Sequence, residues 1–451
     1  MSTKNVWKIS TVLIVMFWLS ACQKFEKEPE EFFSKGQELK ANGFVENDMV
    51  LYWNDKAATV LGVAMRQPDR SRYFAIIEIA VHDALNSIKP KFQRYALMNE
   101  REQFASPDAA VASAAYWAIK GLNRHGAFPV DTWYNESLAT IPDGESKELG
   151  KKLGQHAAEA IIANRANDGF TQVIATSVNP PDGTTPGAYR HTNLLNLRYV
   201  PNWGTVLRPY VVLSNDQYRP AGPNAVISPE YAADYNEVKE KGARVGSTRN
   251  ASEETLAKFW ADNRPSVIWN NFARNIIATK KMDAWKTARL FALMHTAMAD
   301  GINSTLESAY HFYYWRPETA IHEGANDNNN ATAADAAWLP FIIESPNANP
   351  AGNFVSPPIP EYPATYTVYG GVVAEVLQLL FKTDEIEIDL TSFSLPGTTL
   401  HYSSIAQAAR DNSLSKIYTG WHFRKSVLDA EEQGKQIANY VFNHSFREND
   451  E

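Results

Sequence analysis

Three segments in the C-terminal half of the chain combine charged, imidazole and hydroxyl side chains with predicted helix ends. They are AYHFYYWRPETAIHEG (309–324), PPIPEYPATYTVYGGVVAEVLQLLF (357–381) and SKIYTGWHFRKSVLDAEEQGKQIA (415–438). Each places polar residues beside a helix terminus, where unpaired backbone N–H groups and the helix dipole favour a bound anion. The spacing therefore predicts a site for an oxyanion, built from three helix ends that are distant in the sequence.

The elements that must position this site are predicted to be helices. Apolar residues recur at intervals of three and four along most of the chain, and few runs alternate apolar with polar residues, which indicates an all-α fold. The predicted helices cover residues 71–89, 108–123, 146–167, 229–241, 252–262, 282–314, 366–381, 401–412 and 423–442. Residues 170–228 are rich in turn formers instead, and such a long irregular segment favours a lid or a wrap-around loop.

Two of the predicted helices resemble each other. YFAIIEIAVHDALNSI (73–88) and LFALMHTAMADGINST (290–305) share six residue types at matching places. The pairs are Phe74/Phe291, Ala75/Ala292, Ala80/Ala297, Asp83/Asp300, Asn86/Asn303 and Ser87/Ser304. Chance similarity of alanine-rich helices is one explanation. The favoured one is two related helical bundles packed as one globule, over residues 49–245 (with the irregular loop 170–228) and 246–445.

The motifs in these segments resemble a known family. WRPETAI at 315–321, PEYP at 360–363 and GWHF at 420–423 occur in the order and spacing of the vanadium-dependent haloperoxidases, and RANDG at 165–169 matches a further family motif. These enzymes share their fold and anion pocket with the type 2 phosphatidic-acid phosphatases. The resemblance covers roughly residues 50–440 and implies a fold of two four-helix bundles.

The resemblance also implies which positions would bind vanadate. The family uses a lysine before the WRP arginine, that arginine, a Ser-Gly-His triplet after the PxYP proline, and an arginine before the histidine that bonds to vanadium. The matching positions here are Ala309, Arg316, Ala364, Thr365, Tyr366, Lys416 and His422. Only the first arginine and the last histidine are kept. His422 retains the position of the vanadium ligand or nucleophile, whereas Tyr366 replaces the acid/base histidine and Lys416 replaces an arginine.

The energies of the hydrogen bonds that would be lost at these positions argue against vanadate as a cofactor. Each hydrogen bond to a charged group contributes about 1.5–3 kcal/mol. Loss of the lysine, the serine hydroxyl and the histidine, even if half additive, removes roughly 3 kcal/mol, or at least about a hundredfold in affinity. Lys416 also lacks the bidentate geometry of an arginine, and Thr365 adds a side chain where the family has glycine. No cofactor is therefore expected.

Three functions are compatible with this altered pocket. The favoured one is a divergent haloperoxidase-like protein that has lost halide oxidation and keeps its scaffold as a pseudoenzyme or a binding protein for a small molecule or oxyanion. The second is an enzyme of altered mechanism that hydrolyses or rearranges phosphate or diphosphate esters, with His422 as nucleophile and Arg316 and Lys416 holding the anion. The third is a residual vanadium haloperoxidase in which His322 or His401 replaces a missing group.

Aromatic residues surround the same segments. Tyr313, Tyr314 and Trp315 precede Arg316, and Tyr366 and Tyr369 follow the second motif. They either line an aromatic pocket or simply pack between helices.

The N-terminus predicts export and a lipid anchor. Residues 1–22 combine Lys4 and Lys8 with a short apolar run and end in Leu-Ser-Ala-Cys, similar to the lipobox of bacterial lipoproteins, so Cys22 is the predicted lipidation site. It is the only cysteine in 451 residues and forms no disulfide within the chain. Residues 23–48 are charged and fit a flexible tether. The expected location is extracytoplasmic, at the outer membrane of a Gram-negative bacterium, and the net charge of −8 argues against a nucleic-acid partner.

Overall fold

The computed structural model describes residues 47–63, 65–172, 181–190, 203–261, 264–342 and 356–449. Cys22, the signal sequence and residues 23–46 of the predicted tether lie outside these ranges. The first half of the chain contains α2 (Asp48–Leu61), α3 (Gln67–Ile88), α4 (Pro107–Gly121), α5 (Val130–Ala139), α6 (Glu145–Asn164) and η2 (Trp203–Thr205). The second half contains α8 (Pro229–Lys241), α9 (Ala251–Phe259), α10 (Pro265–Thr279), α11 (Ala284–Phe312), α12 (Pro317–Glu323), η3 (Gly324–Asn326), α13 (Val368–Phe381), α14 (Ile405–Tyr418) and α15 (Arg424–His444).

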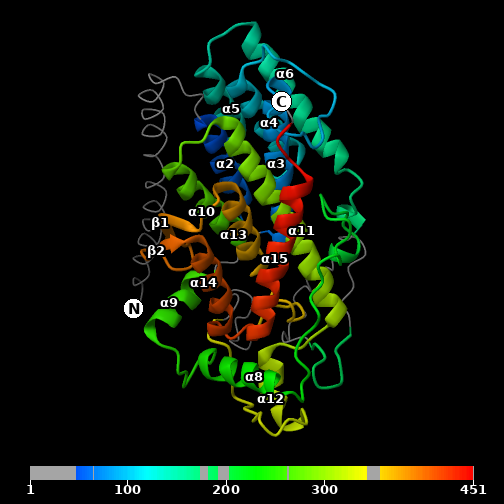
Figure 1. Cartoon of the computed structure of the whole chain (residues 1–451), viewed down its shortest axis with the longest axis vertical. Helices are drawn as coiled ribbons and strands as arrows, with labels where there is room; N and C mark the ends of the chain where they lie inside the picture. The colour runs from blue at the N-terminus through cyan, green and yellow to red at the C-terminus, as the bar shows by residue number, and fades with distance from the viewer. Residues whose placement is uncertain are drawn as a thin grey trace, which may run out of the picture.

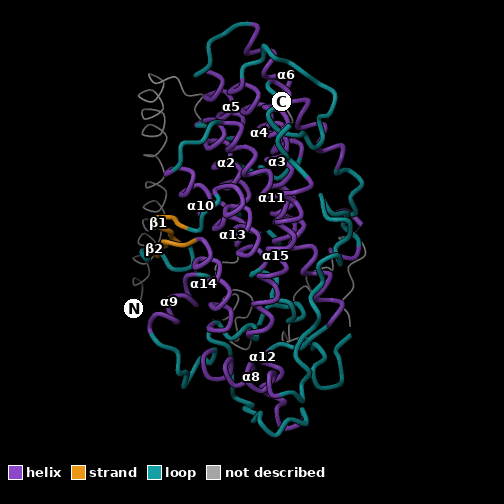
Figure 2. The backbone as a smooth tube through the Cα atoms, viewed as in Figure 1, coloured by secondary structure: helices purple, strands orange, loops and turns teal. Residues whose placement is uncertain are grey.

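The molecule is elongated and helical, which confirms the all-α fold class (Figures 1 and 2). Helices α2 to α6 occupy one end of the long axis, and α8 and α12 lie at the other (Figure 1). Helices α3, α4 and α6 pack together with α2, while α11, α13 and α15 form a second group joined by α14. Helices α3 and α11 pack directly on each other and connect the two groups.

Glycine allows two helices to approach closely in each group. A Cβ atom on Gly154 of α6 would lie 2.3 Å from the carbonyl oxygen of Ala110 in α4. A Cβ atom on Gly434 of α15 would lie 2.3 Å from the carbonyl oxygen of Val368 in α13. Any side chain at these positions would push the paired helices apart. Glycine, which has no side chain, therefore sets the short distance between the helices.

The sequence similarity between α3 and α11 has a structural counterpart. The Asp83 carboxylate accepts hydrogen bonds from three consecutive backbone N–H groups, those of residues 95–97, at 2.6 to 2.9 Å. The Asp300 carboxylate does the same for residues 210–212, at 2.6 to 3.1 Å. Both aspartates are fully buried. Matching residues in the two helices therefore hold matching loops, which favours two related units over chance similarity.

One expected helix begins later than predicted. Residues 385–391 and 399–404 form an antiparallel hairpin, β1 (Glu385–Thr391) and β2 (Thr399–Ser404), so the predicted helix over 401–412 was wrong at its start. The alternation in EIEIDLT was the missed signal, because its apolar residues are buried and its charged residues exposed. The Ser404 side chain then accepts a hydrogen bond from the N–H of Gln407 and caps α14.

Of the helices in the described ranges, α2, α5, α10 and α12 were not predicted. Helix α10 is instructive because PSVIWNNFARNIIAT is rich in asparagine and β-branched residues, which have modest helix propensity. It is helical because it buries Trp269, Phe272 and Ile276, spaced by three and four residues. Packing overrides local preference here.

The long segment 170–228 is irregular where it is described after residue 180. In residues 181–190 and 203–228 the only helix is the short η2 turn. Its residues 210–212 are held by Asp300, and residues 223–226 line a pocket beside the end of α11. Among the described residues, no helix is both long and apolar enough to cross a bilayer.

Candidate functional site

The structure brings the three polar segments of the sequence together near the end of α11. The backbone N–H of Glu361 donates to the carbonyl oxygen of Tyr314 at 2.9 Å, which joins the first segment to the second. The N–H of Ala364 donates to the carbonyl oxygen of Ser426 at 3.2 Å, which joins the second to the third. The predicted site is thus assembled from helix ends that are distant in sequence.

Arg316 lies at the centre of this region and is 0% exposed. Its Nε donates to the carbonyl oxygen of Ile359 at 2.8 Å, and its Nη1 donates to the carbonyl oxygen of Trp421 at 3.0 Å. Nη1 also lies 3.0 Å from Nε2 of His422. Because a guanidinium group only donates, Nε2 must be the acceptor, and the imidazole proton of His422 is on Nδ1.

Glu361 completes the cluster on the other side of the imidazole. Its Oε1 lies 3.0 Å from Nδ1 of His422 and 3.0 Å from the backbone N of Phe423, the residue that precedes α15. A carboxylate of the chain therefore occupies the helix N-terminus where the sequence predicted an external oxyanion. The sequence analysis missed Glu361, although its place inside the PEYP motif was a usable signal.

Burial and neighbouring charge decide the protonation states. Burial, followed by the positive charges of Arg316 and Lys416, holds the pKa of His422 well below its usual value, so this histidine is neutral at pH 7. Burial raises the pKa of Glu361 to about 8, against the opposing effect of Arg316. The neutral histidine agrees with the hydrogen bonds, since its Nδ1–H donates to Glu361 and its Nε2 accepts from Arg316.

Among the remaining predicted positions, only Lys416 carries a charge. Ala309, Ala364 and Thr365 are buried, and Tyr366 is partly buried. The Nζ of Lys416 donates to the carbonyl oxygen of Trp260 and lies 5.9 Å from the Trp421 ring centre. Lys416 thus points toward a backbone carbonyl.

The two histidines considered as replacements are engaged elsewhere. His401 lies on β2 and is 60% exposed, with its ring nitrogens 2.8 Å from Glu387 and 3.1 Å from Asp389. It is part of the hairpin surface, which contradicts its proposed place in the pocket. Nε2 of His322 lies 2.7 Å from the carbonyl oxygen of Trp338.

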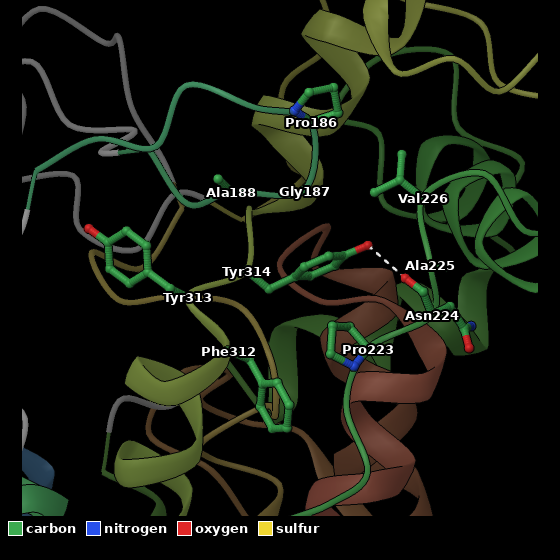
Figure 3. A pocket seen from close by; sticks show the side chains of 10 residues that line it. All are labelled: Pro186, Gly187, Ala188, Pro223, Asn224, Ala225, Val226, Phe312, Tyr313 and Tyr314. Atoms are coloured by element: carbon green, nitrogen blue, oxygen red, sulfur yellow. Dashed lines mark hydrogen bonds between the residues drawn. The ribbon is translucent and has the colours of Figure 1, made fainter.

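A pocket of about 410 Å³ opens beside the WRP motif (Figure 3). It is lined by Pro186, Gly187, Ala188, Pro223, Asn224, Ala225, Val226, Phe312, Tyr313 and Tyr314. The Tyr314 hydroxyl donates to the carbonyl oxygen of Asn224 at 3.2 Å across its floor. The predicted aromatic cluster is thus divided, because Trp315 packs against Tyr231 and the Tyr369 hydroxyl bonds to Ser71.

The sequence of this chain is similar to those of known vanadium-dependent haloperoxidases. Residues 289–450 match the family model for the VCPO second helical-bundle domain. The chain is 22% identical over 486 residues to the vanadium chloroperoxidase of Curvularia inaequalis, a match that covers 83% of this chain and 78% of that protein.

Two solved structures are similar over most of the chain. The first bacterial vanadium-dependent iodoperoxidase superposes with a TM-score of 0.75 at 21% identity, covering 90% of this chain and 98% of that one. An apo-type bacterial vanadium-dependent chloroperoxidase has a TM-score of 0.64 at 16% identity, covering 84% and 94%. The resemblance to the vanadium-dependent haloperoxidases is confirmed, and the chain has their all-α fold.

The residues present do not fit vanadate, the group that this fold implies. Alanine occupies two of the donor positions, 309 and 364. Oε1 of Glu361 already accepts the N–H of Phe423, the helix N-terminal donor that a bound anion would need. Nε2 of His422 already accepts a hydrogen bond from Arg316.

Proposed function

We propose that this chain keeps the haloperoxidase scaffold without vanadate-dependent halide oxidation and acts as a binding protein or pseudoenzyme. Support comes from the replaced donors at positions 309, 364 and 366 and from the pocket of about 410 Å³ next to the motif. That volume is in the range of small-molecule sites, and its lining of proline, phenylalanine and tyrosine suits an apolar or aromatic molecule.

One observation carries the proposal: Nη1 of Arg316 lies 3.0 Å from Nε2 of His422. The two family residues that this chain retains are bonded to each other inside the protein. For vanadate to bind His422, the imidazole would have to lose its hydrogen bond from Arg316, and the anion would have to displace Glu361 from the N–H of Phe423. Breaking a buried charged hydrogen bond costs about 1.5–3 kcal/mol, in addition to the missing donors.

Vanadium content tests this proposal. The full-length chain is incubated with excess orthovanadate, dialysed and analysed by mass spectrometry for vanadium per chain, with halide oxidation by hydrogen peroxide measured in parallel. We expect substoichiometric vanadium and no iodide or bromide oxidation. One vanadium per chain with peroxide-dependent oxidation would establish the residual haloperoxidase instead.

A second candidate is hydrolysis of a phosphate or diphosphate ester, and the contact between Glu361 and His422 favours it. The Glu361 oxygen at Nδ1 fixes the imidazole tautomer with its proton on Nδ1, which leaves the lone pair of the nucleophile on Nε2. Release of phosphate from p-nitrophenyl phosphate or a diphosphate ester, abolished by His422→Ala, would support this candidate. Turnover unchanged in His422→Ala would exclude His422 as nucleophile.

Membrane anchoring through Cys22 at the extracytoplasmic side completes the proposal. The lipobox-like sequence before Cys22 supports it. The chain should incorporate radiolabelled palmitate in bacteria and fractionate with membranes, whereas Cys22→Ser should not. Incorporation of radiolabelled palmitate into Cys22→Ser would show that the lipid is attached at a residue other than Cys22.

A further inference from the structure

We propose that a second cavity, between residues 217–221 and α15, binds a neutral polyhydroxylated molecule such as a sugar or polyol. The cavity measures about 360 Å³, within the range of small-molecule sites. Its walls come from Gln217, Tyr218, Arg219, Pro220 and Ala221 on one side and from polar residues of α15 on the other. This inference does not depend on the function of the Arg316 cluster.

Both cations that line the cavity are already paired with carboxylates. Nε of Arg219 lies 2.9 Å from the Glu307 carboxylate, and Nζ of Lys425 lies 2.7 Å from Oδ2 of Asp429. With Glu432, which also lines the cavity, three carboxylates accompany the two cations. This small negative excess repels an anion, and a ligand of either sign would compete with the ion pairs, so the lining favours a neutral ligand.

One buried amide points to hydroxyl groups as the complementary chemistry. Gln433 is 1% exposed, and its Nε2 donates to the Ser308 hydroxyl at 3.3 Å. Its Oε1 is buried without a hydrogen-bond partner among the residues that the structure describes. Buried amide atoms are rarely left unpaired, because each costs about 1–3 kcal/mol. Exchanging the amide O and N would leave a donor unpaired instead, and a ligand hydroxyl satisfies either arrangement because it both donates and accepts.

An aromatic ring and fixed polar groups complete the site. Tyr218 packs edge-on against Tyr440 with ring centres 6.0 Å apart, and its ring offers a flat apolar surface for the C–H face of a sugar. Asp429 is held by the Tyr362 hydroxyl as well as by Lys425. Because contacts within the protein already hold the Tyr218 ring and the Asp429 carboxylate, ligand binding would cost these side chains little further conformational entropy.

Ligand-detected NMR tests the proposal on the full-length chain in a non-glycosidic detergent. The probes are D-glucose, D-mannose, D-galactose, maltose and myo-inositol, with glucose 6-phosphate as the anionic comparison. We expect saturation transfer to at least one neutral probe, and titration should show no tighter binding of the phosphate. Absence of transfer to every neutral probe, or clear preference for the phosphate, would overturn the proposal.

Variants assign the binding to this cavity. Gln433→Leu preserves the approximate volume and removes the amide, and Tyr218→Ala removes the ring. Each should weaken binding by at least about tenfold, the loss expected for one good hydrogen bond or stacking contact. The matched control is Gln407→Leu, at an exposed glutamine of α14, and should bind normally. Thermal denaturation identifies variants that fail to fold, and normal binding by a folded Gln433→Leu together with a folded Tyr218→Ala would refute the site. Vanadium uptake plays no part in this test.

Discussion

Arg316 donates a hydrogen bond from Nη1 to Nε2 of His422, with 3.0 Å between the two nitrogens. Both residues come from family motifs that lie more than a hundred residues apart in the chain, and both are buried. Glu361 holds the opposite ring nitrogen, so the imidazole is fixed from both sides. The cluster is closed on itself by internal hydrogen bonds, and this arrangement leads to the first two predictions.

Restoring the family donors should restore oxyanion affinity. In the quadruple variant Ala309→Lys, Ala364→Ser, Thr365→Gly and Tyr366→His, vanadate affinity should rise by about a hundredfold or more, because roughly 3 kcal/mol of donor interactions returns. Equilibrium dialysis with vanadium analysis measures the change. The same four substitutions in a His422→Ala background form the control and should gain less. No gain in the quadruple variant would show that Glu361 and the Arg316–His422 bond exclude the anion by themselves.

The stability of the protein should fall as pH rises from about 4.5 to 8, because the folded chain holds the proton on Glu361. Its pKa is about 8 in the folded chain against 4.5 for an ordinary glutamate, so the folded state binds the proton more tightly than the unfolded state. The free energy of unfolding should therefore fall as pH rises from 6.5 to 8, by up to about 1.4 kcal/mol per pH unit. His422 does not contribute there, because its pKa is lowered and its effect lies below 6.5. Urea denaturation should show this slope in the wild type and a smaller one in Glu361→Gln, in which the buried Glu78, with its pKa raised to about 7, still contributes below pH 7; equal slopes would contradict the assignment.

His295 should make the protein sensitive to acid. Burial lowers its pKa to about 3, and its Nε2 lies 2.8 Å from Oδ1 of Asn270. As pH drops from 6.5 toward 3, the His295 imidazole becomes protonated in the unfolded state but stays neutral in the folded state. The free energy of unfolding therefore falls over this range. His295→Gln should flatten this part of the curve. The exposed His444 serves as the comparison, and His444→Gln should leave the acid limb unchanged.

Asp83 and Asp300 should each be required for stability. Replacing either with asparagine turns one acceptor oxygen into a donor that faces backbone N–H groups. We expect a loss of about 2–4 kcal/mol in the free energy of unfolding for each, because buried hydrogen bonds to a charged group are lost. Asp389→Asn, at an exposed position of β1, should change stability by less than about 0.5 kcal/mol. A small effect at only one of the two buried aspartates would argue against equivalent roles.

Filling the pocket beside Tyr314 should abolish binding of apolar probes there. Val226 points into this pocket, and its Cγ2 would lie 3.1 Å from a Cβ on Gly187 (Figure 3). Val226→Trp should reduce binding of an anilinonaphthalene dye by at least about tenfold, because the indole occupies the ligand space. Val245→Trp, at a valine that is 87% exposed, is the matched control. Equal dye fluorescence in the two variants would locate the dye elsewhere.

Much of the fold was predictable because periodicity reports which face of a helix is buried. The helix predicted over 229–241 matches α8, and the one predicted over 108–123 corresponds to α4, which the Ser106 side chain caps by accepting from the N–H of Ala109. Helix α10 was missed because its stability comes from burying Trp269 and Phe272, a tertiary effect. The hairpin was missed because its alternation is only seven residues long.

The family resemblance and the helical class were predictable, because they depend on residue identity and on spacing along the chain. The contacts made by the residues at the matching positions were not predictable in this way. Glu361 contacts His422 across sixty-one residues of sequence, and Arg316 reaches it across one hundred and six. No local pattern encodes such contacts, because the packing of three helix ends brings these charges together, and their burial then fixes which of them carries a proton.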